Sequence, residues 1–521
     1  MKAHLVGGGL ASLAAGAYLI RHGGVLGKNI NIYEAQARLG GSLGVTGSAE
    51  TGYIYPGGRV FEWQYRCAMD LFSMVPSSSN PSKSIKQEIA EFNEHHSWYN
   101  KARLVDHGAK IVSSGHLGLS LQHKIQLAKL ILTPEILLEG KQIKDCVSPD
   151  FFETNFWYIW SSIMAFVPEH SAIEMRRYTI RFLHLLPDLF TMTFILRTRY
   201  NQYQAIVEPL AKWLADQGVN FATETFVSTI DFTPTPGRIT ASALQFIKEG
   251  VMTTVDVGED DLVMVTNGSQ LTDMSIGSME SPPQPKTDET RNSWTLWRSL
   301  ARGRHEFGHP EVFTDHKDQS RWVSFTVTCT DAHFARLMEE FSGREAGRGG
   351  LMTFKRSNWL LTVVRFHQPN FIGQPEGTFV GWGYGIYPEK AGNFVQKPMT
   401  ACTGAEILRE VLAHLGLDSQ ADAIIQSSIC IPCLLPFAGS VCLVRKKADR
   451  PPVVPKGSTN FAFIGQFCEQ PDDVIFTMEY SVRSAWTAVH SLLKTDRKPP
   501  PVYKGYHSPR VLLRAFKALL V

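Results

Sequence analysis

The sequence predicts an α/β fold with several domains, and three observations lead to that prediction. The chain has 521 residues, too many for one hydrophobic core, so two to four domains are expected. It opens with a strand-like run, Ala3–Val6, followed by a glycine-rich turn and a helical pattern that reaches about Arg21. Apolar runs typical of buried strands recur far downstream, at 262–266 and 460–464. Together these features predict a sheet whose strands come from distant parts of the chain.

Composition narrows the class of protein. Hydrophobic residues make up 44% and charged residues 19% of the chain, which is typical of a soluble, well-packed enzyme. The formal net charge is +3 and the basic residues are scattered, so no nucleic acid partner is expected. No apolar run reaches the ~20 residues that a membrane-spanning helix needs.

Eight cysteines form no disulfide framework, and the opening strand leaves no room for a secretory signal. We therefore expect a reducing, cytoplasmic setting. Cys430 and Cys433 make up the one CxxC pair. Without a second pair or nearby histidines, they are expected to be buried structural thiols, and no metal site is expected.

The opening turn has the residues of a dinucleotide-binding site. Gly7 permits the tight turn, Gly9 lets a pyrophosphate approach the backbone, and the small Ser12 lets helix and strand pack closely. The helix N-terminus supplies a positive field for the phosphates. A second strand at 29–33 ends in Glu34, whose carboxylate can accept hydrogen bonds from ribose hydroxyls. These features predict a Rossmann-like nucleotide domain.

Features outside this unit favour FAD over NAD. A Leu-Gly-Gly-Ser turn at 39–42 follows Glu34 closely, as in two-dinucleotide-binding flavoproteins. A helix that opens after 476–477 could direct its N-terminal NH groups at the polar edge of a flavin. Besides Gly7, Gly9, Ser12 and Glu34, the residues expected to bind FAD are Gly40, Gly41, Ser42, Gly57, Gly58, Arg59, Thr266, Asn267, Gly268, Gly465, Phe476 and Thr477.

Insertions into this discontinuous FAD domain are expected to carry the substrate. Residues from about 87 to 196 have a mostly helical, aromatic-rich pattern, which fits a helical core or an apolar tunnel cut from one. β-rich runs between about 303 and 387 predict a mixed sheet, and the polar stretch 274–291 predicts a surface connector. The expected division is an FAD domain (1–80, 205–300, 441–495), a helical insertion that lines the tunnel as a lid (81–204), a substrate-binding domain (301–440) and a C-terminal tail (496–521).

The C-terminal tail is short, basic and apolar, with Arg510, Arg514 and Lys517 at helical spacing. An amphipathic helix here could lie transiently on an anionic membrane surface, which would make the protein peripheral to a membrane. Equally, it could dock on its own protein or on a second subunit. The sequence leaves these alternatives open, and it does not decide between a monomer and a homodimer.

A series of short motifs runs in order along nearly the whole chain. They lie at 7–15, 34, 40–42, 57–59, 155–157, 176–178, 200–203, 266–269, 368–369, 382–385, 449–451 and 463–483. In this order they resemble the motifs of the oleate hydratases, the fatty acid hydratases formerly called myosin-cross-reactive antigens. The resemblance implies an FAD-dependent lyase that adds water to a cis double bond of a free unsaturated fatty acid. It also implies no net redox change, with reduced flavin as the more active form.

The resemblance carries catalytic roles onto this chain, with one departure. Family members carry a glutamate after Gly-Gly-Arg that is held to activate water, and here that residue is Val60, which cannot accept a proton. Tyr178, in the Arg-Arg-Tyr motif, matches the tyrosine proposed to protonate the alkene. Glu62 would face the same side as Val60 in an extended strand and is the candidate substitute base. Arg59 could hold the flavin or a carboxylate.

Tyr178 would be a weak acid, with a pKa of about 10, unless the site stabilises its anion. Arg176 and Arg177 could do so, although adjacent helix residues point in different directions. The family also supplies Thr, Asn and His to the carboxylate region just before Gln-Pro. When the family motif is aligned on Gln368-Pro369, the matching residues here are Val364, Phe366 and Asn370. A shift of the alignment by one or two residues would bring in Thr362 or His367 instead.

Four functions stay open at this point. The first is a hydratase of unsaturated fatty acids, and the second is a double-bond isomerase of a polyunsaturated or polyketide-like chain, for which a missing base matters less. The third is a redox flavoenzyme that kept the fold, and the fourth is a membrane-associated FAD-binding protein without catalysis. Labelled water distinguishes the first two, because a hydratase incorporates its oxygen and an isomerase takes up only its hydrogen.

Overall fold

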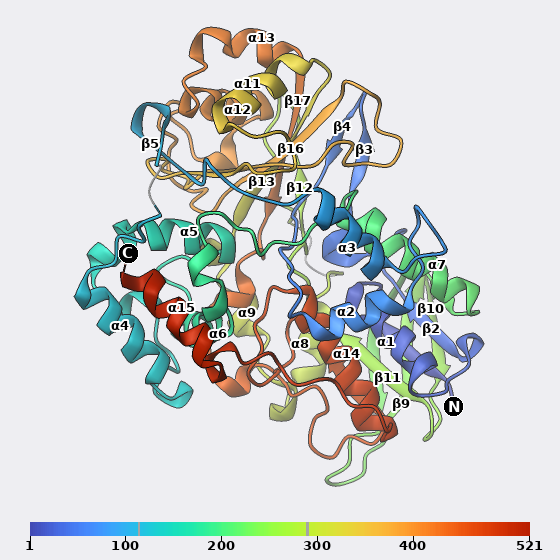
Figure 1. The fold of residues 1–521 in the computed structure, drawn as a ribbon. Coiled ribbons are helices and arrows are strands. Elements are labelled where there is room, and N and C mark those ends of the chain that lie inside the picture. The colour runs from blue at the N-terminus through green and yellow to red at the C-terminus, as the bar shows by residue number, and fades with distance from the viewer. Residues whose placement is uncertain (113–114, 288–290, 521) are drawn as a thin grey trace.

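The structure is a computed structural model that describes residues 1–112, 115–287 and 291–520. Residues 288–290 of the expected connector and Val521 of the expected tail lie outside the described residues. In Figure 1 a mixed sheet with its helices lies at the top, a parallel sheet lies at the lower right, and a group of helices lies at the lower left.

The parallel sheet has five strands in the order β18-β11-β1-β2-β7. Its strands are β1 (Ala3–Val6), β2 (Ile30–Tyr33), β7 (Asn220–Ala222), β11 (Leu262–Thr266) and β18 (Phe461–Ile464). β1 pairs in parallel with β2 on one side and β11 on the other, so the first strand lies in the middle. The prediction of an α/β fold whose parallel strands come from distant segments is confirmed.

Helices and one smaller, three-stranded sheet accompany the parallel sheet. α1 (Leu10–Arg21) is rich in alanine and leucine, is buried from Leu10 to Leu19, and packs against α14 (Met478–Leu493). The other elements of this part are α2 (Arg66–Met74), α3 (Ile85–His95), α7 (Glu208–Asp216), β8 (Thr225–Phe232), β9 (Ala241–Lys248) and β10 (Val251–Asp256). The hairpin of β3 (Thr46–Ser48) and β4 (Gly52–Ile54) packs through β4 against the second, mixed sheet instead.

The mixed sheet has eight strands in the order β12-β17-β13-β16-β15-β14-β5-β6. They are β5 (Leu104–Asp106), β6 (Lys110–Ile111), β12 (Ser275–Ile276), β13 (Trp322–Cys329), β14 (Leu351–Phe354), β15 (Thr362–Arg365), β16 (Phe379–Gly385) and β17 (Ser428–Leu435). β14 and β5 pair in parallel, whereas β13, β15 and β17 pair in antiparallel fashion. α11 (Ala332–Ser342), α12 (Gly404–His414) and α13 (Ala421–Gln426) accompany this sheet at the top of Figure 1. The predicted mixed sheet is therefore present.

Three of its strands come from stretches that the sequence did not assign to it. β5 and β6 lie within the stretch expected to be helical, and β12 lies within the expected connector. These strands have two or three residues each, too few to show the alternation that marks a strand in a sequence. The mixed sheet thus begins before the expected substrate-binding domain.

The helices at the lower left of Figure 1 are α4 (Leu121–Leu132), α5 (Asn155–Met164), α6 (Ala172–Arg181) and α15 (Pro509–Leu520), together with the 3-10 helix η7 (Leu183–Asp188). Short helices α8 (Thr295–Ala301), α9 (Glu311–Thr314) and α10 (Lys317–Ser320) lie between β12 and β13 along the chain, two strands of the mixed sheet. None of the helices in the described ranges is long and apolar enough to cross a membrane.

α15 docks on the protein by one face only. Ala515 is buried, and Arg514 Nη2 lies 3.3 Å from Asp188 Oδ2 in η7. Leu512, Leu513 and Phe516 are exposed. The predicted amphipathic helix is present. Of the alternatives that the sequence left open, these contacts support docking of the helix on its own protein.

Candidate functional site

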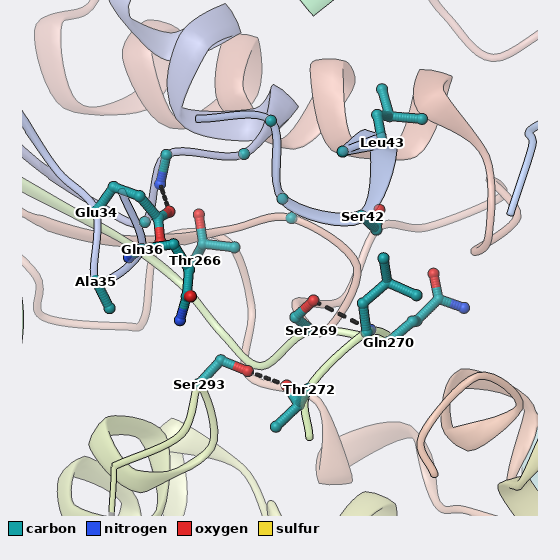
Figure 2. Close-up of a pocket in the computed structure, with 18 of the residues that line it drawn as sticks. Glu34, Ala35, Gln36, Ser42, Leu43, Thr266, Ser269, Gln270, Thr272 and Ser293 are labelled. Atoms are coloured by element: carbon teal, nitrogen blue, oxygen red, sulfur yellow. Dashed lines mark hydrogen bonds between the residues drawn. The ribbon is translucent and has the colours of Figure 1, made fainter. Parts of the chain in front are cut away.

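A cavity of about 850 Å³ opens at the carboxyl ends of β1, β2, β11 and β18. In parallel α/β sheets, ligands bind at this edge. Figure 2 shows Glu34, Ser42 and Thr266 on its wall, with Ser269 and Gln270 nearby. We call it the first cavity.

The glycine turn leaves the N-terminus of α1 open toward this cavity. Gly7 has φ +95°, a left-handed conformation that favours glycine. Gly9 is the N-cap of α1, no side chain caps it, and the first turn holds no acidic residue. A Cβ on Gly41 would lie 3.1 Å from the Gly9 Cα, so the two turns meet backbone to backbone. Uncapped NH groups and a bare backbone fit a phosphate ligand.

Glu34 stands at the end of β2, on the wall of the first cavity. Its Oε2 accepts a hydrogen bond from the Gly8 NH at 2.7 Å, and its Oε1 accepts one from the Gln36 NH at 2.8 Å. Burial raises the pKa of this carboxyl, and the NH bonds from Gln36 and Gly8 partly oppose that rise. A carboxylate has about four lone-pair positions, so room remains for ribose hydroxyls.

Most residues expected to bind FAD line the first cavity. They are Gly7, Gly9, Glu34, Gly40, Gly41, Ser42, Arg59, Thr266, Gly268, Gly465 and Thr477. Ser12 lies beneath it, with Oγ 3.2 Å from Thr266 Oγ1, which suits the expected packing of helix on strand. Asn267 is buried and not among the lining residues. Gly57, Gly58 and Phe476 line a neighbouring cavity instead.

This second cavity has a volume of about 160 Å³ and mainly apolar walls. It shares Arg59, Gln270 and Leu271 with the first cavity, so the two adjoin. Val60 and Trp98 are also on its wall. The cavity is smaller than the roughly 300–1,000 Å³ of typical ligand sites, so a long chain needs adjoining space or side-chain movement.

The three positions anchored on Gln368-Pro369 all line the second cavity: Val364, Phe366 and Asn370. Thr362 does not, because its Oγ1 faces Thr353 Oγ1 at 3.0 Å. His367 packs edge-on against His96, with ring centroids 4.9 Å apart. The geometry therefore favours the alignment without a slip.

Arg59 stands where the two cavities meet. Its Nη2 donates to Gln270 Oε1 at 3.1 Å, and its guanidinium lies 4.4 Å from the centre of the Phe476 ring. Burial lowers the pKa of Arg59 to about 10, with Tyr55 and Tyr178 acting in the opposite direction. Arg59 therefore remains a cation at neutral pH.

A third cavity, of about 50 Å³, brings Val60, Glu62 and Tyr178 together with Phe476 and Thr477. Val60 and Phe476 also line the second cavity, and Thr477 lines the first. Val60, Glu62 and Tyr178 thus surround one space beside the expected flavin site, whereas Arg59, the third catalytic candidate besides Tyr178 and Glu62, lines the first and second cavities instead. Their roles stay predictions.

Tyr178 is buried, and its hydroxyl donates a hydrogen bond to the Ile475 carbonyl. Burial, followed by Cys442 and Glu174, raises the pKa of Tyr178 well above its usual 10. The stabilisation of its anion by Arg176 and Arg177 is not formed. Arg177 instead pairs with Glu135 at 2.8 Å and Glu469 at 2.6 Å, and Arg176 lies 3.5 Å from Glu135. On α6, neighbouring side chains leave in different directions.

Glu62 is 5% exposed and held from two sides. Arg181 Nη1 lies 3.1 Å from Oε1, and His184 Nε2 lies 3.0 Å from Oε2. As expected for an extended segment, Glu62 and Val60 reach the same cavity.

Cysteines and metals play no visible part in these cavities. All eight cysteines are free, and Cys430 and Cys433 are buried in β17, as predicted. In the described part of the chain, no group of three or more His, Cys, Asp or Glu side chains could hold a metal ion.

Three residues on the cavity walls escaped the sequence analysis: Gln270, Arg197 and Arg365. Gln270 holds Arg59 and follows directly on the matched motif 266–269. Arg365 directly follows the mostly apolar run 359–364. A single charged residue at the end of such a strand pattern could have indicated a buried arginine. Arg197 had no comparable signal in the sequence.

Comparisons with known proteins agree with this arrangement. An oleate hydratase of Streptococcus pyogenes serotype M49 (strain NZ131) is 36% identical over 99% of this chain and 89% of its own length. A linoleate hydratase of Lactiplantibacillus plantarum is 31% identical over 99% of this chain and 98% of its own.

Solved structures of amine oxidases share the fold. A wild-type putrescine oxidase has a TM-score of 0.57 at 12% identity, covering 95% of this chain and 99% of that one. The cyclohexylamine oxidase of Brevibacterium oxydans has a TM-score of 0.55 at 12% identity, covering 95% and 98%. The MCRA family model matches residues 1–490. By these matches over nearly its whole length, the chain belongs to the MCRA family.

Proposed function

We propose that the protein is an FAD-dependent hydratase that adds water to a cis double bond of an unsaturated fatty acid and gives a hydroxy fatty acid. Family membership and the names of its two hydratase relatives support this function. The observation that carries the proposal is the third cavity, where the matched tyrosine, Tyr178, lies between an apolar cavity and the dinucleotide cradle.

The first cavity fits FAD in three respects. The uncapped start of α1 and the turn at Gly40 and Gly41 can receive the phosphates, and Glu34 can receive the ribose. The start of α14 at Thr477 adds a second helix N-terminus on the same wall. Reduced flavin, the form we expect to be more active, would when bound supply an electron-rich ring that stabilises positive charge on the substrate.

Tyr178 is the proposed proton donor. Its raised pKa keeps the hydroxyl protonated at neutral pH, and the hydroxyl must turn from the Ile475 carbonyl to reach a substrate. The proton goes to one alkene carbon while the oxygen of a water molecule bonds to the other carbon. The surplus proton of that water then leaves to a base, and the phenolate of Tyr178 regains a proton.

Glu62 is the proposed acceptor of the water's proton, since Val60 cannot take it. Glu62 lines the same cavity as Tyr178. His184, bonded to Glu62 Oε2, offers a route by which that proton can move on.

A double-bond isomerase is the second candidate, and one observation favours it. The family's water-activating position is the apolar Val60, on the wall of both the second and third cavities. An isomerase needs proton addition and removal but no activated water. A redox flavoenzyme is a third candidate, and stoichiometric consumption of dioxygen or another electron acceptor would identify it.

Contact with a membrane surface is part of the proposal. The outer face of α15 carries exposed Leu512, Leu513 and Phe516 beside exposed Arg510 and Lys517. Apolar and basic side chains on one helix suit an anionic lipid surface. Binding to anionic but not to neutral vesicles, lost in Phe516→Ser, would support this contact, and equal binding to both would count against it.

Labelled water tests the proposed function. The FAD-loaded protein, reduced anaerobically, is incubated with a panel of unsaturated fatty acids in water enriched in oxygen-18, and the products are read by mass spectrometry. We expect one oxygen-18 atom in a hydroxy fatty acid. A product with solvent hydrogen but no solvent oxygen would make the protein an isomerase, and stoichiometric consumption of an acceptor would make it a redox enzyme.

A further inference from the structure

The face of the mixed sheet that is turned away from the second cavity has a cavity of its own. Successive side chains of a strand point to opposite faces. Along β15, Val364 therefore lines the second cavity, whereas Val363 and Arg365 point toward α11, where Arg365 Nη2 donates to Ser342 Oγ at 2.7 Å. The cavity on this side has a volume of about 60 Å³ and lies between α11, α12 and the sheet. We call it the α11 cavity.

A glycine opens the floor of the α11 cavity directly beside Arg365. Arg365 pairs with Gly381 of β16, and Gly381 pairs with Val327 of β13, so the three residues form one row across the sheet. A Cβ on Gly381 would have one atom of the described residues beyond its chain neighbours within 4 Å, the Val364 carbonyl oxygen at 3.8 Å. The missing side chain thus leaves space next to the guanidinium.

Arg365 has a hydrogen-bond donor that no group of the protein uses. Its Nη2 donates to Ser342 Oγ and to the Arg344 carbonyl. Nε and Nη1 are buried without a partner in the described part of the chain. Nε lies against Gly350, where a Cβ would be 2.8 Å from it. Nη1, with two hydrogens, is therefore the donor that remains for a ligand.

The charge of Arg365 is also unmatched. Its hydrogen bonds go to a hydroxyl and to carbonyl groups, and in the described ranges no carboxylate lies within ion-pair distance of the guanidinium. Burial lowers the pKa of Arg365 to about 10, against the influence of Glu339, so the side chain is a cation at neutral pH. A buried cation without a counter-charge costs free energy, which a bound anion would offset.

The other walls of the α11 cavity are apolar. Phe334 and Met338 come from α11, Val411 comes from α12, and Phe325 comes from the sheet. Arg365 is the one charged residue among the described residues that line it. The volume gives room for about four to six water molecules, and so for a ligand of roughly as many non-hydrogen atoms. A small anion with a short apolar chain fits both the charge and the walls.

We propose that the α11 cavity is a binding site for a short-chain carboxylate. The carboxylate accepts hydrogen bonds from Arg365, and its alkyl chain lies over Gly381 between α11 and the sheet. The site lies on the opposite face of β15 from the cavities of the proposed function, so it does not depend on hydration of a fatty acid.

Butyrate and 1-butanol test the site, because they have chains of equal length and differ in charge. Binding to the FAD-loaded protein is measured by saturation-transfer NMR titration for the wild type, Arg365→Gln and Gly381→Val. The valine side chain would fill the floor of the α11 cavity and would not reach the second cavity, so this variant locates the ligand. Arg336→Gln, which removes an exposed arginine of α11, is the matched control.

We expect Arg365→Gln to lose about tenfold in affinity for butyrate, the loss typical of a hydrogen bond to a charged group, while its affinity for 1-butanol stays within about twofold. Gly381→Val should lose about tenfold or more for both ligands, because an overfilled cavity excludes them. Arg336→Gln should bind both as the wild type does. Acetate, with the same head and a shorter chain, should bind the wild type about tenfold more weakly than butyrate.

Three results would overturn the site. A wild type that does not bind butyrate would mean that water satisfies Arg365 Nη1. Unchanged butyrate affinity in Gly381→Val would place the binding elsewhere, and equal losses of butyrate and 1-butanol in Arg365→Gln would mean that the arginine only holds the end of α11. If Arg365→Gln does not fold, Gly381→Val decides alone, because its side chain enters open space and breaks no hydrogen bond of Arg365.

Discussion

The first cavity begins at a turn of glycines, whereas the second and third cavities are lined mainly by residues with larger side chains, and the two kinds of wall differ in how far a sequence reveals them. Around Gly7, Gly9 and Gly41, a side chain would fill the space or strain the turn. Around Val60 and Val364, one polar side chain can be exchanged for an apolar one without moving the backbone. A cofactor site of the first kind is therefore readable from glycine spacing, and a substrate site of the second kind is not.

Tyr178→Phe should have the largest effect, because it removes the proton donor and leaves the first cavity untouched. We expect turnover to fall by about 100-fold or more, the lower end of what a general acid contributes. The FAD content should match the wild type by absorbance. Activity above roughly a tenth of wild type in the flavin-loaded variant would remove Tyr178 from the acid role.

Glu34→Ala should weaken FAD binding in the first cavity. Loss of hydrogen bonds between a carboxylate and ribose is worth roughly 1.5–3 kcal/mol, so the Kd for FAD should rise by about 10- to 100-fold. Fluorescence titration measures it, with Glu259→Ala, an exposed acid, as the control. An unchanged Kd for FAD in Glu34→Ala would contradict the ribose contact.

Val60→Glu restores the carboxylate at the family's water-activating position. We expect oleate hydration to increase by about tenfold, less than the 10²–10⁴ of an evolved general base, because the new carboxylate is placed among apolar neighbours. Product formation in labelled water measures the gain. No gain in a folded, flavin-loaded variant would mean that Val60 is not where the missing base belongs.

The pH profile should show the smallest effect. A general acid acts in its protonated form, so a rate that depends on Tyr178 falls only as pH rises through its pKa. Burial holds that pKa well above 10, and kcat should therefore not fall between pH 7 and 9 on account of this group. A fall within this range that disappears when Tyr178 is replaced would show that its anion is stabilised after all.

The sequence predicted the parallel sheet and its glycine turns closely, because each of these turns depends on a residue type that few others can replace. It located Tyr178, Glu62 and Val60 by motif, and these residues do surround one cavity. It could not show that Arg181 and His184 contact Glu62, because Glu62 lies more than 100 residues before both of them and only the fold brings them together.

Short elements and isolated charges mark the limits of prediction. β5, β6 and β12 join the mixed sheet through pairing with strands far away in sequence, and their own two or three residues carry no periodic signal. Arg197 is unremarkable as a sequence letter, and its burial against Trp98 is a property of the fold. The division into six segments stays a prediction.

Titration of the purified protein with FAD tests the central claim, that the opening strand, turn and helix form a dinucleotide cradle. We predict that one FAD binds per chain and that the protein acquires the yellow absorbance of a flavin. A folded protein that stays colourless after incubation with excess FAD and removal of the unbound cofactor would contradict the account.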